Sequence, residues 1–420
     1  MADTPEPQTA KPNTSESGHA GFSSWLGSLV DEAETAPELQ WPLNILVYDR
    51  MRRQESQVVS VLRAVKLPIL RAEWSIDPAG ADDDVVQLVS EDLGLPVKGR
   101  DSKPLPRTRD RFSWNEHLRH ALLMLDFGHM FFEQVYRIDA TGRARLRKLG
   151  PRLPRTLSAV TVADDGGLMS ITQHPISMKT KSRPIPVAHL VAYCNEREGG
   201  NWFGQSLLRA AYKNWLIKDV MLRVQAQTVD RNGMGVPIYE AAPGETSLDK
   251  GLKLATSLRS GDNAGAAIPN GAKLGLYGVD GNLPDADKVI RYHDEQMARA
   301  VLAHFLNLGT QTGSWALGST FADFFTLSLQ AVADELADVA TQHIVEDLVD
   351  INFGLEVPAP RIVCAPINSR RDATAEAIKI LVDAGVITAG DDIERFVRST
   401  YGLPAMTPDR STEPAEQENP

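Results

Sequence analysis

The sequence predicts an α+β fold in which short strands and helices are followed by a series of long helices. Three stretches have helical periodicity over more than twenty residues, namely 206–231, 287–308 and 320–352. The region 129–192 instead contains short alternating segments bounded by turn residues, which is typical of antiparallel strands. The third long stretch spaces its apolar residues at nearly 3.6-residue intervals, so one face should be buried. The predicted line is Phe325, Leu329, Val332, Leu336, Ala340, Ile344, Leu348 and Ile351.

The amino-acid composition is ordinary for a globular protein with two or three hydrophobic cores. It argues against several classes of protein. The 420 residues are 42% hydrophobic and 24% charged, with a net charge of -11. Non-specific affinity for DNA comes mainly from Lys and Arg side chains, so a protein with this net negative charge is not expected to bind DNA over a broad surface. Cys194 and Cys364 are too few and too far apart for a disulfide framework or a Cys-based zinc site. No run of eighteen apolar residues predicts a membrane span.

The first part of the chain alternates helix and strand signals. Apolar spacing predicts a helix over 58–69 that Pro68 ends, and AEWSIDP predicts a short strand after it. Ser113 and Glu116 form a capping-box pattern at the start of a helix that should stop near Gly128. The aromatic, alternating segment 129–138 then predicts a strand.

The most basic stretch of the chain follows, over 143–155. It contains Arg143, Arg145, Arg147, Lys148, Arg152 and Arg155. Such a run is compatible with a patch for nucleic acid or an acidic partner. We favour the simpler interpretation, a solvated pair of strands.

The two long helices at 206–231 and 287–308 enclose a smaller mixed region. Asn232 and Gly233 should cap the first helix, and Asp285 or Asp287 should begin the second. Between them the sequence predicts a strand at 235–241, a short helix at 248–261 and a glycine-punctuated strand pair at 264–279.

An uncharged loop joins the second and third long helices. The stretch 309–320 holds Gly309, Gly313 and Gly318 together with Ser, Thr and Gln residues and a single aromatic residue, Trp315. It offers no acid, base or nucleophile that can be paired with a partner, so catalysis there is not expected.

Catalytic motifs are absent from the rest of the sequence as well. There is no P-loop, no GxGxxG spacing, no HExxH and no GxSxG. His117, His120 and His129 are near enough in sequence to be metal ligands, although ordinary surface or core histidines are the interpretation we favour. The sequence therefore predicts no cofactor, no metal and a structural role.

Taken in order, these segments resemble the portal proteins of tailed bacteriophages, in particular the Mu-like portal family. The resemblance covers about 40–404 and rests on five stretches: AEWSIDP with FGHMFFEQVYR, Gly204–Asp219, Asp287–Leu302 with its EQMARA, LVDINFG, and the tail 372–404. Gly235 and Pro237 fit the strand that follows the first long helix. The segment LAHFLNL departs from the pattern LGQTLT that is common in that family.

This resemblance implies a portal fold with an α/β wing, a two-helix stem, a small α/β clip and a helical crown. It assigns 25–205 and 321–368 to the wing, 206–233 and 287–308 to the stem, 234–286 to the clip, 309–320 to a tunnel loop and 369–404 to the crown. From composition we expect disordered ends at 1–24 and 405–420.

The same resemblance implies a function and a set of partners. Portal proteins form a ring, usually of twelve copies, at one capsid vertex, and double-stranded DNA passes through it without sequence specificity during packaging and ejection. The implied partners are further copies of the chain, the terminase large subunit, a head-tail adaptor, and the major capsid and scaffolding proteins. The implied location is the virion, after assembly in the cytoplasm of the host bacterium, with no membrane contact.

Two sets of residues are candidates for contact with DNA or partners. In the tunnel loop, Gln311, Thr312, Ser314 and Trp315 should face the channel, although Trp315 is also compatible with a buried anchor or a contact with a neighbouring copy. In the clip, Lys250, Lys253 and Arg259 should contact terminase and the adaptor. The alternatives are a soluble metal-dependent enzyme using His117, His120 and His129, or another phage head-tail ring protein.

Overall fold

The computed structural model describes residues 34–100, 112–175, 177, 181–258, 266–277, 285–300 and 315–367. The chain divides into two compact units, Met1–Cys364 and Ala365–Pro420. Of the second unit only 365–367 are described, so the predicted crown at 369–404 lies outside the described residues, as do the two chain ends.

The chain opens with a helical layer. A short 3-10 turn, η2 (Pro37–Leu39), precedes α1 (Leu43–Gln54) and α2 (Ser56–Arg71). The Glu55 side chain caps α2 by accepting a hydrogen bond from the Gln57 N–H. Pro68 lies inside α2 rather than at its end. A proline removes only one backbone donor, and the fully buried Ile69 holds the last turn against the core.

A three-stranded antiparallel sheet forms the centre of this unit, in the order β3-β2-β7. The N-cap half of the predicted capping box is confirmed, because the Ser113 hydroxyl accepts from the Glu116 N–H. The predicted single helix is two, since α4 ends at Ala121 and the one-turn α5 ends at Gly128 in a left-handed conformation. The elements here are α4 (Trp114–Ala121), α5 (Met124–Phe127), β2 (His129–Ile138), β3 (Ala144–Arg152) and β7 (Leu190–Cys194).

The basic stretch is indeed part of this strand pair. Arg145 pairs with Glu91 and Asp92, and Arg152 pairs with Glu133, so two of its six cations are neutralised inside the fold. A bulge opposite Val135 and Tyr136 leaves Arg147 without a strand partner, and Arg147 and Lys148 are both exposed.

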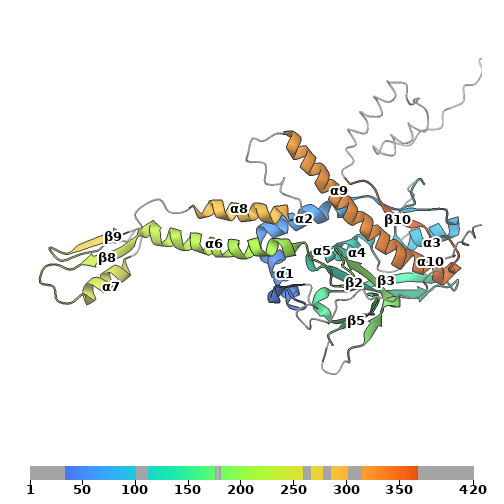
Figure 1. Cartoon of the computed structure of the whole chain (residues 1–420), viewed down its shortest axis with the longest axis horizontal. Helices are drawn as coiled ribbons and strands as arrows, with labels where there is room; N and C mark the ends of the chain where they lie inside the picture. Colours follow the sequence, from blue (N-terminus) through green and yellow to red (C-terminus); the bar gives the residue numbers. More distant parts are fainter. Residues whose placement is uncertain are drawn as a thin grey trace, which may run out of the picture. The chain divides into compact units, whose positions relative to one another are not determined.

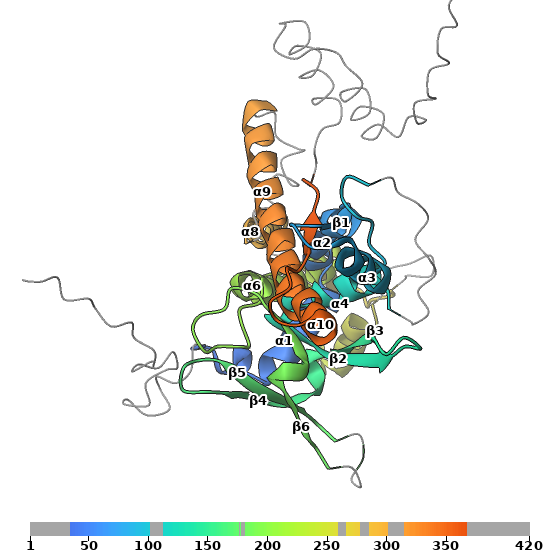
Figure 2. The same ribbon diagram turned by 90° about the vertical axis from the view of Figure 1, so that its right-hand side faces the viewer.

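Smaller sheets flank the central one. The strands β4, β5 and β6 form an antiparallel sheet, and Figure 2 shows them next to one another. The strand predicted from AEWSIDP, β1, pairs with β10 near the end of the described chain. These flanking elements are α3 (Asp83–Leu93), η3 (Pro154–Thr156), η4 (Val187–His189), β1 (Trp74–Asp77), β4 (Leu157–Val162), β5 (Leu168–Gln173), β6 (Pro184–Pro186) and β10 (Arg361–Cys364).

Two long helices lie side by side beyond this core and enclose the small mixed region, as Figure 1 shows for α6 and α8. The helix α6 continues to Met234 and is capped by Gly235 at φ 68°, two residues later than predicted. Asp285 caps α8 as predicted. Of the predicted strand pair, the described residues 266–277 contain one strand, β9, which pairs with β8. The bounds are α6 (Leu208–Met234), β8 (Val236–Glu240), α7 (Asp249–Ser257), β9 (Lys273–Tyr277) and α8 (Ala286–Arg299).

The third long helix differs from the prediction at both ends. The helix α9 (Trp315–Ala340) begins at Trp315 rather than Thr320, and a π-helical turn, η6 (Thr341–Val345), separates it from α10 (Glu346–Phe353). A π turn takes up more residues than an α turn, so it rotates the following face. Ile351, predicted to be buried, is therefore 56% exposed, and the Asn352 side chain bonds both the N–H and the C=O of Ala144 on β3.

None of the helices in the described part of the chain is long and apolar enough to cross a membrane.

Two glycines bring the start of β2 against the loop that leads into α6. Gly128 and Gly204 have φ of 91° and 58°, which side chains rarely adopt. A Cβ on Gly204 would lie 2.4 Å from the Gly128 carbonyl oxygen and 2.5 Å from that of Asn195. Since both neighbours are backbone atoms, no side-chain rotation relieves the overlap. This contact therefore fixes where α6 leaves the core.

We predict that Gly204→Ala lowers the free energy of unfolding by more than about 3 kcal/mol, because overlap adds to the cost of a left-handed alanine. Gly142→Ala is the matched control, with φ of 84° and nothing within 4 Å of its Cβ. It should cost only about 1–2 kcal/mol. Urea denaturation followed by circular dichroism measures both, and equal losses would contradict the close-approach argument.

Candidate functional site

The first feature of the candidate site is a buried lysine where α6 leaves the core. Lys218 is 5% exposed, and its Nζ lies 2.6 Å from Glu55 Oε1 and 2.6 Å from Asp294 Oδ1. Burial alone lowers the pKa of Lys218, but the hydrogen bonds to Asp294 and Glu55 outweigh it and leave the pKa raised. Lys218 is therefore charged, and it joins α6, α8 and the cap of α2.

Further polar contacts surround this lysine. The Gln57 side chain donates to the Asp294 carbonyl oxygen at 3.4 Å, and His293 Nδ1 lies 3.0 Å from Asn214 Oδ1. The α6–α8 hairpin is thus fixed to the helical layer by side chains of both helices. Its direction does not depend on a loop.

The second feature is an apolar stripe on α6 that faces away from α8. Leu216, Val220 and Val224 are four residues apart and so share one face of the helix, and they are 42%, 54% and 41% exposed. The residues of α6 that pack into the core lie on the opposite face, namely Leu208, Ala211, Trp215 and Lys218. Exposed apolar residues continue elsewhere on the hairpin at Leu222, Val229, Val289 and Tyr292. Exposed apolar side chains that share one helix face, as these three do, are typical of an interaction site.

The third feature is the β8–α7–β9 unit at the far end of the hairpin. The Tyr239 ring packs directly on α7, and a Cβ at Gly251 would lie 2.0 Å from its Cδ1, so only glycine allows this approach. Tyr239 also donates to Glu245 at 2.9 Å. Few of its described residues are buried, and its apolar surface includes Val236, Ile238, Leu248, Leu252, Leu276 and Tyr277.

The residues predicted for partner contact are only partly described. Lys250 and Lys253 are exposed on α7, and Arg259 lies outside the described residues. In the predicted tunnel loop, Gln311, Thr312 and Ser314 also lie outside them. Trp315 is the first residue of α9, and the description covers its backbone only. The assignment of these residues to the channel or to partners stays a prediction.

The three histidines of the alternative prediction have separate roles in the fold. His117 is buried beside Tyr193, 2.8 Å from its hydroxyl, and burial lowers the pKa of His117 to about 3. His129 donates through Nδ1 to the Phe203 carbonyl at 3.0 Å, and burial lowers its pKa to about 4. His120 bonds the Glu116 carbonyl within its own helix. No group of three or more His, Cys, Asp or Glu suited to a metal occurs among the described residues.

With this geometry described, the comparisons identify the protein's class. Residues 45–403 match the family described as the portal protein of Mu bacteriophage. The chain belongs to this family. It is accordingly a phage portal protein, a structural component that forms a portal ring. Membership of this family disfavours the alternative function, a metal-dependent enzyme.

Solved structures from gene transfer agent (GTA) particles share the fold. A chain in the virion of the native particle is 12% identical, with a TM-score of 0.55, and the match covers 87% of this chain and 95% of that one. A chain in the neck of the empty particle is 11% identical, with a TM-score of 0.54 and coverage of 86% and 94%. A chain in the neck of the native particle, computed with C12 symmetry, is 10% identical, with a TM-score of 0.53 and coverage of 85% and 93%. At such identities the likeness concerns the fold.

Sequence reasoning missed the Lys218 cluster, although a signal was present. Lys218 continues the spacing of Leu208, Ala211 and Trp215, so a charged residue lies on the buried face of a long helix. A lysine in that position requires a carboxylate partner. Nothing in the sequence, however, indicates that Glu55 and Asp294 provide it.

We predict that Lys218→Met lowers the free energy of unfolding by about 3–5 kcal/mol, because it leaves Glu55 and Asp294 facing each other without a cation. Lys213→Met, at an exposed position of the same helix, should change it by less than about 0.5 kcal/mol. Adding Glu55→Gln and Asp294→Asn to Lys218→Met should recover part of the loss. Denaturant titration tests all three variants, and no recovery would mean that packing, not charge, is responsible.

Proposed function

We propose that about twelve copies of this chain close into a ring at one vertex of the capsid, and that DNA enters and leaves through its centre. Family membership supports the ring, and the twelvefold symmetry of a similar neck structure supports the number. In this proposal α6 and α8 are the stem and the β8–α7–β9 unit is the clip. The elements before Gln205 and after Thr320 are the wing, and 369–404 are the crown.

The observation that carries this proposal is the apolar stripe of Leu216, Val220 and Val224 on α6. A closed ring uses two different surfaces of each copy, so every stem helix has a neighbour on each side. In the described part of the chain the three side chains of this face stay 41% to 54% exposed. Burial of that face against the next copy would remove its apolar surface from water, at about 25 cal/mol for each Å².

We further propose that the ring is a conduit without chemistry of its own, with no catalytic activity, cofactor or bound metal. The net charge of -11 supports free passage, since an acidic ring repels phosphates instead of gripping them. Its partners in this proposal are terminase, a head-tail adaptor, and the capsid and scaffolding proteins. Assembly takes place in the host cytoplasm before incorporation into the virion.

We predict that replacing Leu216, Val220 and Val224 together by serine prevents ring formation. Wild-type protein should show particles of about twelve times the 46.0 kDa chain mass in mass photometry, and the triple variant should remain at or near the single-chain mass. A control that replaces Lys213 and Gln227, polar residues on the same face of α6, by serine should still form rings, because it removes little apolar surface. Rings of normal size from the triple variant would place the subunit interface elsewhere.

A separate prediction concerns the tunnel loop, where twelve copies would converge. One charge per copy would gather about a dozen like charges at one radius, so a neutral loop of Gln311, Thr312, Ser314 and Trp315 suits the channel. Thr312→Lys with Ser314→Lys should leave rings intact but slow DNA packaging, most strongly at low salt. Ser60→Lys with Thr161→Lys adds the same charge outside the loop and should package normally. If the loop variant and the wild type package DNA at equal rates at every salt concentration, the loop does not line the constriction.

The clip prediction concerns partner binding. Reversing Lys250, Lys253 and Arg259 to glutamate should weaken co-purification with the terminase large subunit and the head-tail adaptor, while rings still form. The matched control reverses three exposed arginines of the wing, Arg63, Arg71 and Arg119. If the clip variant loses assembly but keeps binding, the clip is an assembly element and the contact assignment is wrong.

A further inference from the structure

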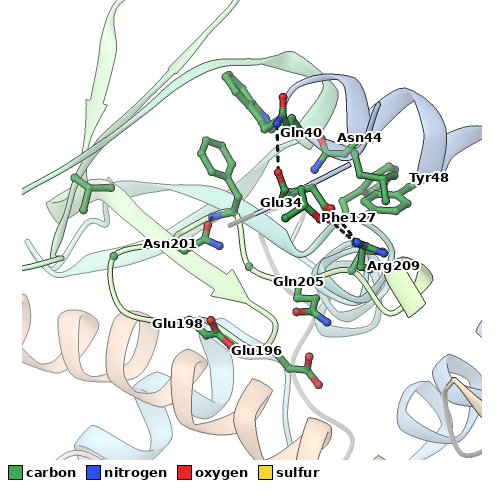
Figure 3. Close-up of a pocket in the computed structure, with 18 of the residues that line it drawn as sticks. Glu34, Gln40, Asn44, Tyr48, Phe127, Glu196, Glu198, Asn201, Gln205 and Arg209 are labelled. Carbon is green, nitrogen blue, oxygen red and sulfur yellow. Dashed lines mark hydrogen bonds and ion pairs between the residues drawn. The ribbon is translucent and has the colours of Figure 1, made fainter. Parts of the chain in front are cut away.

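A cavity of about 900 Å³ lies at the first turn of α6, outside the features that the proposed function uses. Its walls come from segments far apart in the sequence: the start of the described chain, α1, the end of α5, the β4–β5 turn and the loop that leads into α6. Figure 3 shows Gln40, Asn44 and Tyr48 on one side of it, with Glu196, Glu198 and Gln205 on the other. A cavity of this volume accommodates several side chains or a small ligand.

The cavity has an aromatic wall and an acidic rim. Trp41 and Phe203 stack with ring centroids 4.8 Å apart, and the buried Tyr48 and Phe127 continue this wall. Glu196 and Glu198 are exposed at the rim. Of these four rings only Trp41 and Phe203 are partly exposed, so an apolar occupant would contact chiefly these two, and the rim disfavours an occupant with negative charge.

The described chain begins at this cavity, and its path there is fixed. Both carboxylate oxygens of Glu34 are held by Arg209 of α6, one of them at 2.9 Å from Nη2. The Gln40 side chain donates to the Glu34 carbonyl oxygen at 3.2 Å, and the Ala36 N–H donates to Glu34 Oε1 at 2.8 Å. Glu34, the first described residue, itself lines the cavity.

The residues just before this point have the composition that the cavity suits. The segment 22–30 reads FSSWLGSLV and carries no charge. Its large apolar residues are spaced as on one face of a helix, at Phe22, Trp25, Leu26, Leu29 and Val30. Only three residues separate Val30 from Glu34, so four Cα–Cα steps of 3.8 Å limit their separation to about 15 Å.

We propose that residues 22–30 of the same chain dock in this cavity and cover its aromatic wall. The short tether gives the segment an effective concentration of the order of millimolar, so even a weak apolar contact would be occupied most of the time. Because Arg209 belongs to α6, docking would tie the beginning of the chain to the base of the helix hairpin. The same segment of a neighbouring copy is a different occupant, which the experiment distinguishes.

The test is photo-crosslinking in the full-length chain, with benzoylphenylalanine in place of Trp25. We expect intramolecular cross-links, mapped by mass spectrometry, to 41–48 or 196–206. The same probe in place of Thr14, eight residues before the segment, should give few cross-links to these residues. Gln205→Trp, which fills the cavity mouth, should reduce the Trp25-site cross-link several-fold, whereas Lys213→Trp on the exposed surface of α6 should not.

Three results would overturn the proposal. Cross-linked dimers as the main product would assign the cavity to a neighbouring copy. Cross-links that map outside the cavity residues would show that the segment lies elsewhere. Equal yields from the Trp25 and Thr14 positions, or no effect of Gln205→Trp, would mean that the cavity does not hold the segment. Ring formation is scored separately, so failure here leaves the proposed portal function unaffected.

Discussion

The ammonium group of Lys218 holds together the parts of the fold on which the function depends. Its two carboxylate partners come from the junction of α1 and α2 and from α8, while the lysine itself belongs to α6. A buried charge with one partner missing costs several kcal/mol, so the three segments are fixed relative to one another or all are destabilised. The hairpin is therefore an extension that is held to the core at its base. A ring that must keep its subunit contacts while DNA passes needs such an extension.

The same geometry explains why the surface of the hairpin is apolar. The face of α6 that carries Lys218 and Trp215 is buried against α8 and the core, whereas Leu216, Val220 and Val224 stay exposed in the described part of the chain. The β8–α7–β9 unit beyond it buries little and exposes several large apolar side chains. Both surfaces are unfavourable in a solitary chain. They are expected in a subunit whose stable form is an assembly.

The sequence was a good guide to elements with a strong local signal and a poor guide to contacts between distant segments. Helical spacing predicted α6, and the Ser113 cap and the β2 strand were predicted within a residue or two. The predicted burial of Ile351 was wrong because a π-helical turn rotates α10. No local sequence pattern predicts that turn. The tertiary features were missed for a related reason. Glu55, Lys218 and Asp294 are joined by folding alone, and the cavity beside Arg209 is built from four separate segments.

In the proposed ring, the outer face of α6 is buried between neighbouring copies. A cryo-electron microscopy reconstruction of the purified wild-type protein measures this directly. We expect a cyclic particle, with about twelvefold symmetry, in which Leu216, Val220 and Val224 of each copy contact the stem helices of the next. A ring in which these three side chains face solvent or the lumen, or a preparation that contains only single chains, would contradict it.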